Sequence, residues 1–227
     1  MCIRDSVLAA TTSQMEAGDL FVPETEDAAA VALATPLTGE TGPTVVCLPA
    51  YLPKTTSRLL AAAAMASALR QPANHPTEDH HPRCDRAVIT LMRAGTADPA
   101  WAASLTWAQT NLFPLVVVCL DASGSAAFTA KIAKTAKTAK TEERFEWTTV
   151  SRTAARLHLP ILTLDGDDAV AMYRATQEAL LRARMGGGPA LLWAVLPTPA
   201  ELAQRPRNQR PLPRLAQYLR TRGISPS

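Results

Sequence analysis

Short apolar runs alternate with longer alanine-rich or amphipathic segments along most of the chain. The short runs are rich in β-branched residues and are bounded by Pro, Gly or Asp, a pattern typical of strands buried on both faces. The longer segments contain few helix breakers and predict helices. Strands that alternate with helices imply right-handed crossovers between parallel strands. The pattern therefore predicts an α/β fold, a three-layer sandwich with a mostly parallel sheet.

The predicted elements cover most of the sequence. Strands are expected at residues 44–48, 87–92, 115–120, 161–164 and 190–196. Helices are expected at residues 27–37, 58–70, 99–111, 148–158, 168–185 and 213–222. The helix at 168–185 is amphipathic, and its buried candidates include Val170, Tyr173, Ala175, Leu180 and Leu181. Three glycines and a proline at 186–189 predict its end.

Two polar segments separate these elements. Residues 71–86 are rich in Pro, His and charged side chains, and residues 129–146 include the lysine repeat KIAKTAKTAK. Both are predicted to be internal loops, and the repeat is expected to be solvated instead of contacting a polyanion. Residues 7–227 are predicted to form one domain, because the length suits a single α/β domain. Residues 1–6 are predicted to be non-native or disordered.

Composition narrows the class of protein. Hydrophobic residues make up 47% of the chain and charged residues 19%, which indicates a globular protein. A net charge of +3 gives too weak a field to predict nucleic-acid binding. No run approaches the roughly 18 apolar residues of a membrane span, and the N-terminus lacks the apolar core of a signal peptide. No membrane partner is expected.

The cysteines favour a reducing compartment. Cys2, Cys47, Cys84 and Cys119 are widely scattered, with no spacing typical of a disulfide framework or a metal site. We therefore predict a cytoplasmic protein. Cys47 and Cys119 lie inside apolar runs and are interpreted as small buried hydrophobic residues.

The histidines give little indication of a site. His75, His80, His81 and Cys84 have residue types suited to zinc, but their spacing matches no closed set of four ligands, so a hydrated linker is favoured. His158 stands at a predicted helix end, where it is expected to interact with the helix dipole.

A series of motifs in the last third of the chain resembles a known family. In order, these are Ala154, Ala155 and Pro160; the turn Leu164 to Asp168; Tyr173, Ala175 and Ala179 in the long helix; and Gly186 to Leu191. This combination is similar to the α-subunit of thiamine-diphosphate-dependent 2-oxo-acid dehydrogenases, the pyruvate and branched-chain type. The chain resembles a shortened and divergent member.

A second set of residues supports the resemblance. The family has a G-D-G turn after one strand and an E-N-N sequence at the end of the next. Here these places are taken by Arg93, Ala94 and Gly95, and by Leu120, Asp121 and Ala122. Phe113 and Pro114 precede the second strand, as L-P does in the family. Weaker matches put Glu26 to Leu33 and Pro213 to Gly223 on family helices.

The resemblance implies a thiamine-diphosphate-binding-like fold, thiamine diphosphate with magnesium as cofactor, and oxidative decarboxylation of a 2-oxo acid. It also implies a homo- or hetero-oligomer with a β-like subunit. In the family, the Asp of G-D-G and the last Asn of E-N-N supply oxygen ligands to the metal. Their places fall on Ala94 and, in an ungapped alignment, on Ala122, and neither side chain supplies an oxygen. If the alignment shifts by one residue, Asp121 takes the second place. The family's His-Ser loop is also missing from the short link after Leu196.

Three hypotheses follow. The first is a catalytically impaired α-like protein that does not bind thiamine diphosphate by the usual metal site. The second is an active oxidoreductase subunit with relocated cofactor anchors, for which the candidates are Arg93, Gly95, Asp98 and Asp121. The third is a non-catalytic interface partner of a β-like subunit. No catalytic residue and no metal ligand are assigned.

Overall fold

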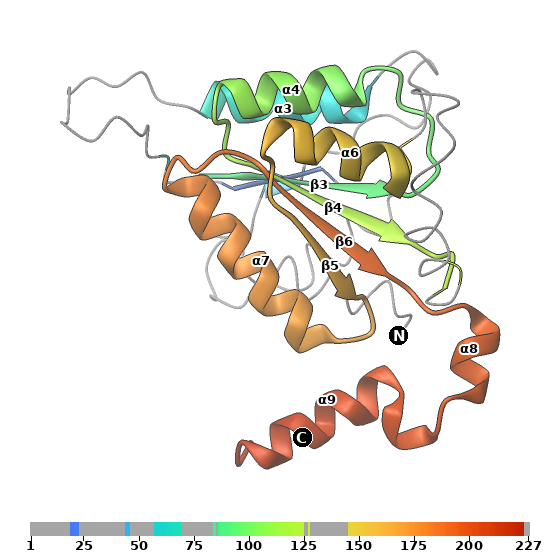
Figure 1. Ribbon diagram of the computed structural model, residues 1–227. Coiled ribbons are helices and arrows are strands. Elements are labelled where there is room, and N and C mark those ends of the chain that lie inside the picture. Colours follow the sequence, from blue (N-terminus) through green and yellow to red (C-terminus); the bar gives the residue numbers. More distant parts are fainter. Residues whose placement is uncertain are drawn as a thin grey trace.

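A computed structural model describes residues 19–22, 44–45, 57–69, 84, 86–124, 127 and 145–224. Its centre is a sheet of six strands in the order β2-β1-β3-β4-β6-β5, and every neighbouring pair is parallel (Figure 1). The strands are β1 (Leu20–Val22), β2 (Thr44–Val45), β3 (Val88–Arg93), β4 (Leu115–Asp121), β5 (Ile161–Asp165) and β6 (Ala190–Val195). The predicted parallel sheet is confirmed.

The three central strands explain the apolar runs in the sequence. Every residue of β4 and β6 is buried, as is every residue of β3 except Arg93. Strands covered on both faces need apolar side chains at consecutive positions, so apolar and polar residues do not alternate along them. β1 was not predicted, because a three-residue strand followed by Pro23 is too short to show a pattern. Buried Asp19 holds its start, accepting a hydrogen bond from the Ala87 N–H at 2.7 Å.

Helices cover both faces of the sheet. On one face lie α3 (Arg58–Leu69), α4 (Trp101–Thr110) and α6 (Trp147–Leu157), and on the other lies α7 (Ala169–Arg184) (Figure 1). The core is divided in the same way, with one apolar cluster under the first three helices and a second under α7. These helices match the predicted ones closely, and the three-layer sandwich is confirmed.

The predicted buried face of α7 is partly wrong. Ala175 and Leu180 are buried, but Tyr173 and Leu181 are exposed and Val170 is only half-buried. The face that packs on the sheet consists of Met172, Ala175, Thr176, Ala179, Leu180 and Ala183. Small residues dominate it because α7 lies close to β4, β5 and β6.

The C-terminal segment contains more helix than predicted. After β6 come α8 (Pro199–Gln204), the 3-10 turn η1 (Arg207–Gln209) and α9 (Pro211–Thr221). Only a helix at 213–222 was expected. α8 begins with a capping box, in which the Glu201 N–H donates to Thr198 Oγ1 and Glu201 Oε2 accepts from the Thr198 N–H. No residue of these three elements is buried.

Several predictions lie outside the described residues: the helix at 27–37, the end of the strand at 44–48, residues 1–6, Cys47, the three histidines at 75–81 and most of both internal loops. The single-domain assignment stays a prediction. Cys119 is buried, as predicted. Cys84 is also buried and its N–H donates to the Arg184 carbonyl, so a hydrated linker is wrong at this residue. Within the described ranges, no helix is long and apolar enough to cross a membrane.

Candidate functional site at the carboxyl edge of the sheet

The ends of β3 and β4 lie side by side at the carboxyl edge of the sheet. Arg93 is paired in register with Leu120, and the Ala94 N–H donates to the Leu120 carbonyl at 3.0 Å. Ligands of open α/β sheets collect at this edge, because parallel strands present their loops there together. The sequence places the two family metal motifs at these strand ends, so their positions meet in space as the resemblance implies.

The turn after β3 keeps a fixed backbone although its motif is changed. Gly95 has φ +83°, a conformation that L side chains rarely adopt, and no heavy atom lies within 4 Å of the position of an added Cβ. The Gly95 N–H donates to the Phe145 carbonyl, and the Phe145 N–H donates to the Thr96 carbonyl. This pair of bonds ties the turn to the segment that leads into α6.

The Asp121 side chain accepts hydrogen bonds from groups of the core. It is buried, its Oδ1 accepts from the Ser123 N–H at 3.0 Å, and its Oδ2 accepts from the Trp193 indole Nε1–H at 3.2 Å. Trp193 is itself fixed by the rings of Phe145 and Trp147. Both carboxylate oxygens therefore satisfy donors of the fold.

Asp98 has a similar role beside the β3 turn. Its buried side chain accepts from the Leu59 N–H at Oδ2 and from the Ala100 N–H at Oδ1, both at 3.2 Å. Leu59 lies in the first turn of α3, and Ala100 directly precedes α4. Asp98 thus supplies acceptors to the starts of two helices, where backbone N–H groups have no partner within the helix.

The residues at the two strand ends do not fit a metal-bridged diphosphate. Ala94 is half-buried against the core and Ala122 is exposed, and neither side chain has an oxygen. Magnesium requires oxygen ligands in near-octahedral geometry. Among the described residues, no group of three His, Cys, Asp or Glu side chains could hold a metal ion. The side chain of Arg93 is exposed at the same edge.

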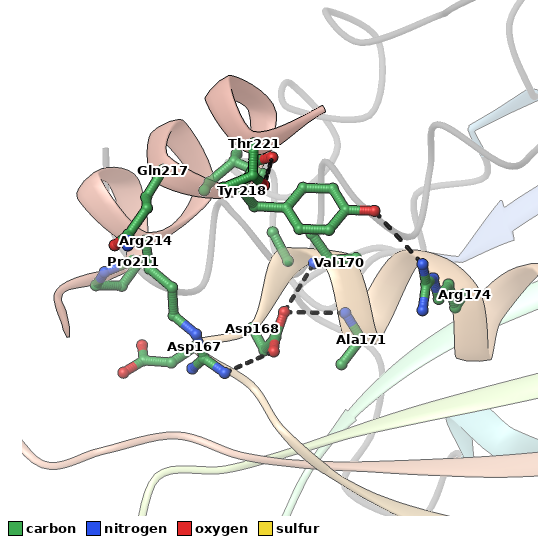
Figure 2. Close-up of a pocket in the computed structure, with 12 residues that line it drawn as sticks. Asp167, Asp168, Val170, Ala171, Arg174, Pro211, Arg214, Gln217, Tyr218 and Thr221 are labelled. Atoms are coloured by element: carbon green, nitrogen blue, oxygen red, sulfur yellow. Dashed lines mark hydrogen bonds and ion pairs between the residues drawn. The ribbon is translucent and has the colours of Figure 1, made fainter. Parts of the chain in front are cut away.

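A dense charged network surrounds the next turn at this edge, which links β5 to α7. Arg214 of α9 contacts Asp165 Oδ2 at 3.1 Å and Asp168 Oδ2 at 2.7 Å. Asp168 also caps α7, because its Oδ1 accepts from the N–H groups of Val170 and Ala171 at 3.0 Å (Figure 2). We call residues 165–168 the acidic turn. It connects α7 to the C-terminal helix.

Asp167 is the buried member of the acidic turn. Its side chain is inaccessible to solvent, its Oδ2 pairs with Arg205, and its Oδ1 has no hydrogen-bond partner. Burial raises the pKa of Asp167 above its ordinary value of 3.8, although the Arg205 charge acts in the opposite direction. The Arg205 ion pair therefore compensates only part of the cost of burying this carboxylate.

An open groove of about 450 Å³ lies between the start of α7 and α9. Its walls come from Asp167 to Ala171 and Arg174 on one side and from α9 on the other, and Arg174 Nη2 donates to the Tyr218 hydroxyl at 3.4 Å (Figure 2). The N-terminus of α7 offers no anion site here, because Asp168 already accepts from its first N–H groups.

Comparisons with known proteins match the part of the chain that contains the acidic turn. The family model of the dehydrogenase E1 component matches residues 130–196, which include the acidic turn, α7 and β6. The subunit alpha of acetoin:2,6-dichlorophenolindophenol oxidoreductase from Bacillus subtilis (strain 168) is 46% identical over 44 residues. This chain resembles the α-subunit of thiamine-diphosphate-dependent 2-oxo-acid dehydrogenases. The Bacillus match covers 19% of the α-like chain and 13% of its relative, so it concerns one segment of a longer protein.

Solved structures show the fold of the α-like chain. A protein from Mycobacterium smegmatis, described as a thiamin diphosphate-dependent enzyme, superposes with a TM-score of 0.53 at 15% identity. Benzoylformate decarboxylase from Polynucleobacter necessarius gives 0.50 at 12% identity. These comparisons cover 86% and 85% of the α-like chain, but only 32% and 33% of the solved chains. The fold is thiamine-diphosphate-binding-like, and the α-like chain spans about a third of the length of these proteins.

Sequence reasoning missed the charged network. It recognised Asp165 to Asp168 only as a family motif and predicted a proline-rich link where Arg205 lies. One signal was present: residues 202–227 contain no Asp or Glu but carry Arg205, Arg207, Arg210, Arg214, Arg220 and Arg222. Such an uncompensated cluster of one charge near the chain end indicates an acidic counterpart.

Proposed function

We propose that this protein is a divergent 2-oxo-acid dehydrogenase α-like subunit that is catalytically impaired and does not bind thiamine diphosphate by the usual metal site. One observation carries the proposal: Ala94 and Ala122 occupy the two adjacent strand ends where the family resemblance calls for oxygen ligands. Without these ligands, magnesium would keep only water and phosphate around it, and the protein would contribute little to holding it.

The neighbouring carboxylates offer poor replacements. Asp98 and Asp121 are both buried, and their oxygens accept from backbone or indole N–H groups. Turning either one toward a metal would leave buried donors without a partner, at a cost of about 1–3 kcal/mol for each group. The hydrogen bonds of Asp98 and Asp121 are therefore consistent with loss of the usual metal site.

Titration calorimetry with magnesium and thiamine diphosphate tests this proposal. The purified chain should give no saturable heat and no 2-oxo-acid decarboxylation, either alone or mixed with a β-like subunit. An α-subunit with intact G-D-G and E-N-N motifs is the positive control. The double substitution Ala94→Asp and Ala122→Asn should not restore full activity, because the His-Ser loop is also missing. Tight magnesium-dependent binding by the unmodified chain would contradict the proposal.

The second candidate is an active oxidoreductase subunit with relocated anchors. The exposed Arg93 side chain beside the β4 end supports it, because a fixed positive charge there could contact a diphosphate directly. Gly95, Asp98 and Asp121 are the other proposed anchors. If this candidate holds, Arg93→Ala abolishes a measurable binding heat, whereas Arg86→Ala, at the opposite end of β3, leaves it unchanged.

The third candidate is a non-catalytic interface partner in a homo- or hetero-oligomer with a β-like subunit. It is supported by Ala94 and Ala122, because a chain without oxygen ligands at these strand ends can still contribute a surface to an oligomer. Under this proposal, the protein is located in the cytoplasm and binds neither nucleic acid nor membranes. Light scattering of the chain alone and with a β-like subunit tests it, since a mixture that never forms a heavier species contradicts a hetero-oligomer.

A further inference from the structure

The groove between α7 and α9 is apolar along its middle. Val170 and Ala171 of α7 form one wall. Leu215 and the Tyr218 ring of α9 form the other, and all four side chains are only half-buried. The volume of about 450 Å³ lies within the range of roughly 300–1,000 Å³ that is typical of small-molecule sites. An organic molecule of modest size would remove this apolar surface from water.

The two ends of the groove differ in charge (Figure 2). At one end, Arg214 contacts Asp168 Oδ2 at 2.7 Å, so the charges there compensate one another. At the other end lies Arg174, whose Nη2 donates to the Tyr218 hydroxyl at 3.4 Å. This bond is long and its acceptor is neutral, whereas a guanidinium binds most strongly to an anion. The Arg174 end is therefore suited to a negatively charged group.

A second cation lies against Tyr218. The exposed Arg222 guanidinium stands over the Tyr218 ring, 5.6 Å from its centroid. Among the described residues, neither Arg174 nor Arg222 forms an ion pair with Asp or Glu. Neither acidic residue occurs in the sequence after Glu201. The surroundings of Tyr218 therefore carry a net positive charge, which attracts an anion to this end of the groove.

We propose that the groove binds a small monocarboxylate with an apolar body, such as a short aliphatic or aromatic acid. The carboxylate accepts from Arg174, because a guanidinium can donate two parallel N–H bonds to it. The apolar body lies between Val170 and Leu215. A doubly charged anion is disfavoured, since Asp167 and Asp168 also line the groove and repel added negative charge. The site lies outside the β3 and β4 ends and does not depend on cofactor binding.

The bound carboxylate also affects the attachment of α9, because its two walls come from different elements. No residue of α9 is buried, and Arg214 joins this helix to the acidic turn through exposed ion pairs. A molecule that binds only when both walls are in place stabilises the attached arrangement increasingly as its concentration exceeds its Kd. The site therefore couples carboxylate binding to the position of the C-terminal helix.

Hexanoate is the probe, and its binding to the full chain is measured by equilibrium dialysis. It should bind saturably and slow trypsin cleavage after Arg207 and Arg220, which do not line the groove, while cleavage elsewhere stays unchanged. Acetate lacks the apolar body and hexylamine has the opposite charge, so each should bind about tenfold more weakly or worse. These comparisons leave the protein unaltered, so they do not depend on how a variant folds.

A pair of variants locates the site. Arg174→Gln should weaken hexanoate binding by about tenfold, because it removes the charge-assisted hydrogen bonds. Arg182→Gln is the matched control, since Arg182 is an exposed arginine of the same helix that does not line the groove. Trypsin digestion without hexanoate checks that α9 stays attached in both variants.

Any of four results would overturn the proposal: no saturable binding of hexanoate, equal binding of hexylamine, equal loss in Arg174→Gln and Arg182→Gln, or binding without protection of the C-terminal segment. Tighter binding of hexyl phosphate than of hexanoate would overturn the assignment to carboxylates. Magnesium and thiamine diphosphate are left out of these assays, so the outcome is independent of the proposed function.

Discussion

Two turns at the same edge of the sheet use their side chains in different ways. The β3 and β4 ends lie side by side, with Gly95 in a left-handed conformation, and carry alanine methyl groups where the family resemblance implies metal ligands. The acidic turn after β5 instead has three carboxylates, all paired with arginines from the C-terminal segment. Two turns at one edge of a sheet can therefore differ in what they bind, since the chemistry of a site depends on its side chains.

The comparison also separates two uses of a buried aspartate. Asp121 at the first site satisfies donors of the core, whereas Asp167 at the second binds a segment that has no buried residue of its own. Removing the first should loosen the sheet and aromatic cluster. Removing the partner of the second should release the C-terminal helices.

The largest effect is expected from Arg205→Ala. It leaves the Asp167 carboxylate buried without its cation, and breaking one side of a buried pair costs about 3 kcal/mol. Limited proteolysis within residues 199–224 and urea unfolding would measure the loss. The control is Arg205→Gln combined with Asp167→Asn, which leaves no unpaired charge and should cost less. Equal losses in both variants would contradict the electrostatic attachment.

A smaller loss, of about 2 kcal/mol, is expected from Asp121→Ala, because the buried Trp193 indole and the Ser123 N–H both lose their acceptor. The fluorescence of the tryptophan cluster and urea unfolding would report it. Asp121→Asn keeps an acceptor oxygen and should lose less. A variant that keeps its stability but loses cofactor binding would assign Asp121 to an anchor instead.

The pH dependence of stability should reveal Asp167. Its pKa is raised in the folded state, so the native protein binds more protons than the unfolded chain between about pH 3.8 and the higher folded pKa. Its contribution to stability is therefore full below pH 3.8 and is lost as pH rises through the higher folded value. The unfolding free energy of Asp167→Asn, relative to the unmodified protein, should rise over this window. Asp165→Asn, in the same turn, is the control, and an equal slope there would contradict the assignment.

The smallest effect is expected from Arg214→Gln. Its contacts with Asp165 and Asp168 are partly exposed, and such pairs contribute about 0–1 kcal/mol. The difference from the unmodified protein should shrink further in high salt. Thermal unfolding at low and high ionic strength would measure it. A loss as large as that of Arg205→Ala would mean that the exposed pairs, and not the buried one, hold α9.

The sequence by itself determined the layers, most helices and strands, and the meeting of the β3 and β4 ends. Apolar runs specify buried parallel strands, and consecutive parallel strands place their carboxyl ends at one edge. The sequence also showed that alanines occupy positions 94 and 122, where the family motifs have metal ligands. Aligning a motif needs no knowledge of three-dimensional contacts.

Only the tertiary structure decided how the polar side chains are used. Asp121 reaches Trp193 across 72 positions of sequence, and Arg205 and Arg214 reach the acidic turn across 38 to 49 positions. No local pattern encodes such pairs. The orientation of α9 was likewise hidden, because hydrophobic spacing shows that a helix has an apolar face but not what that face meets. Here no α9 residue is buried, and Arg214 pairs with Asp165 and Asp168 of the acidic turn.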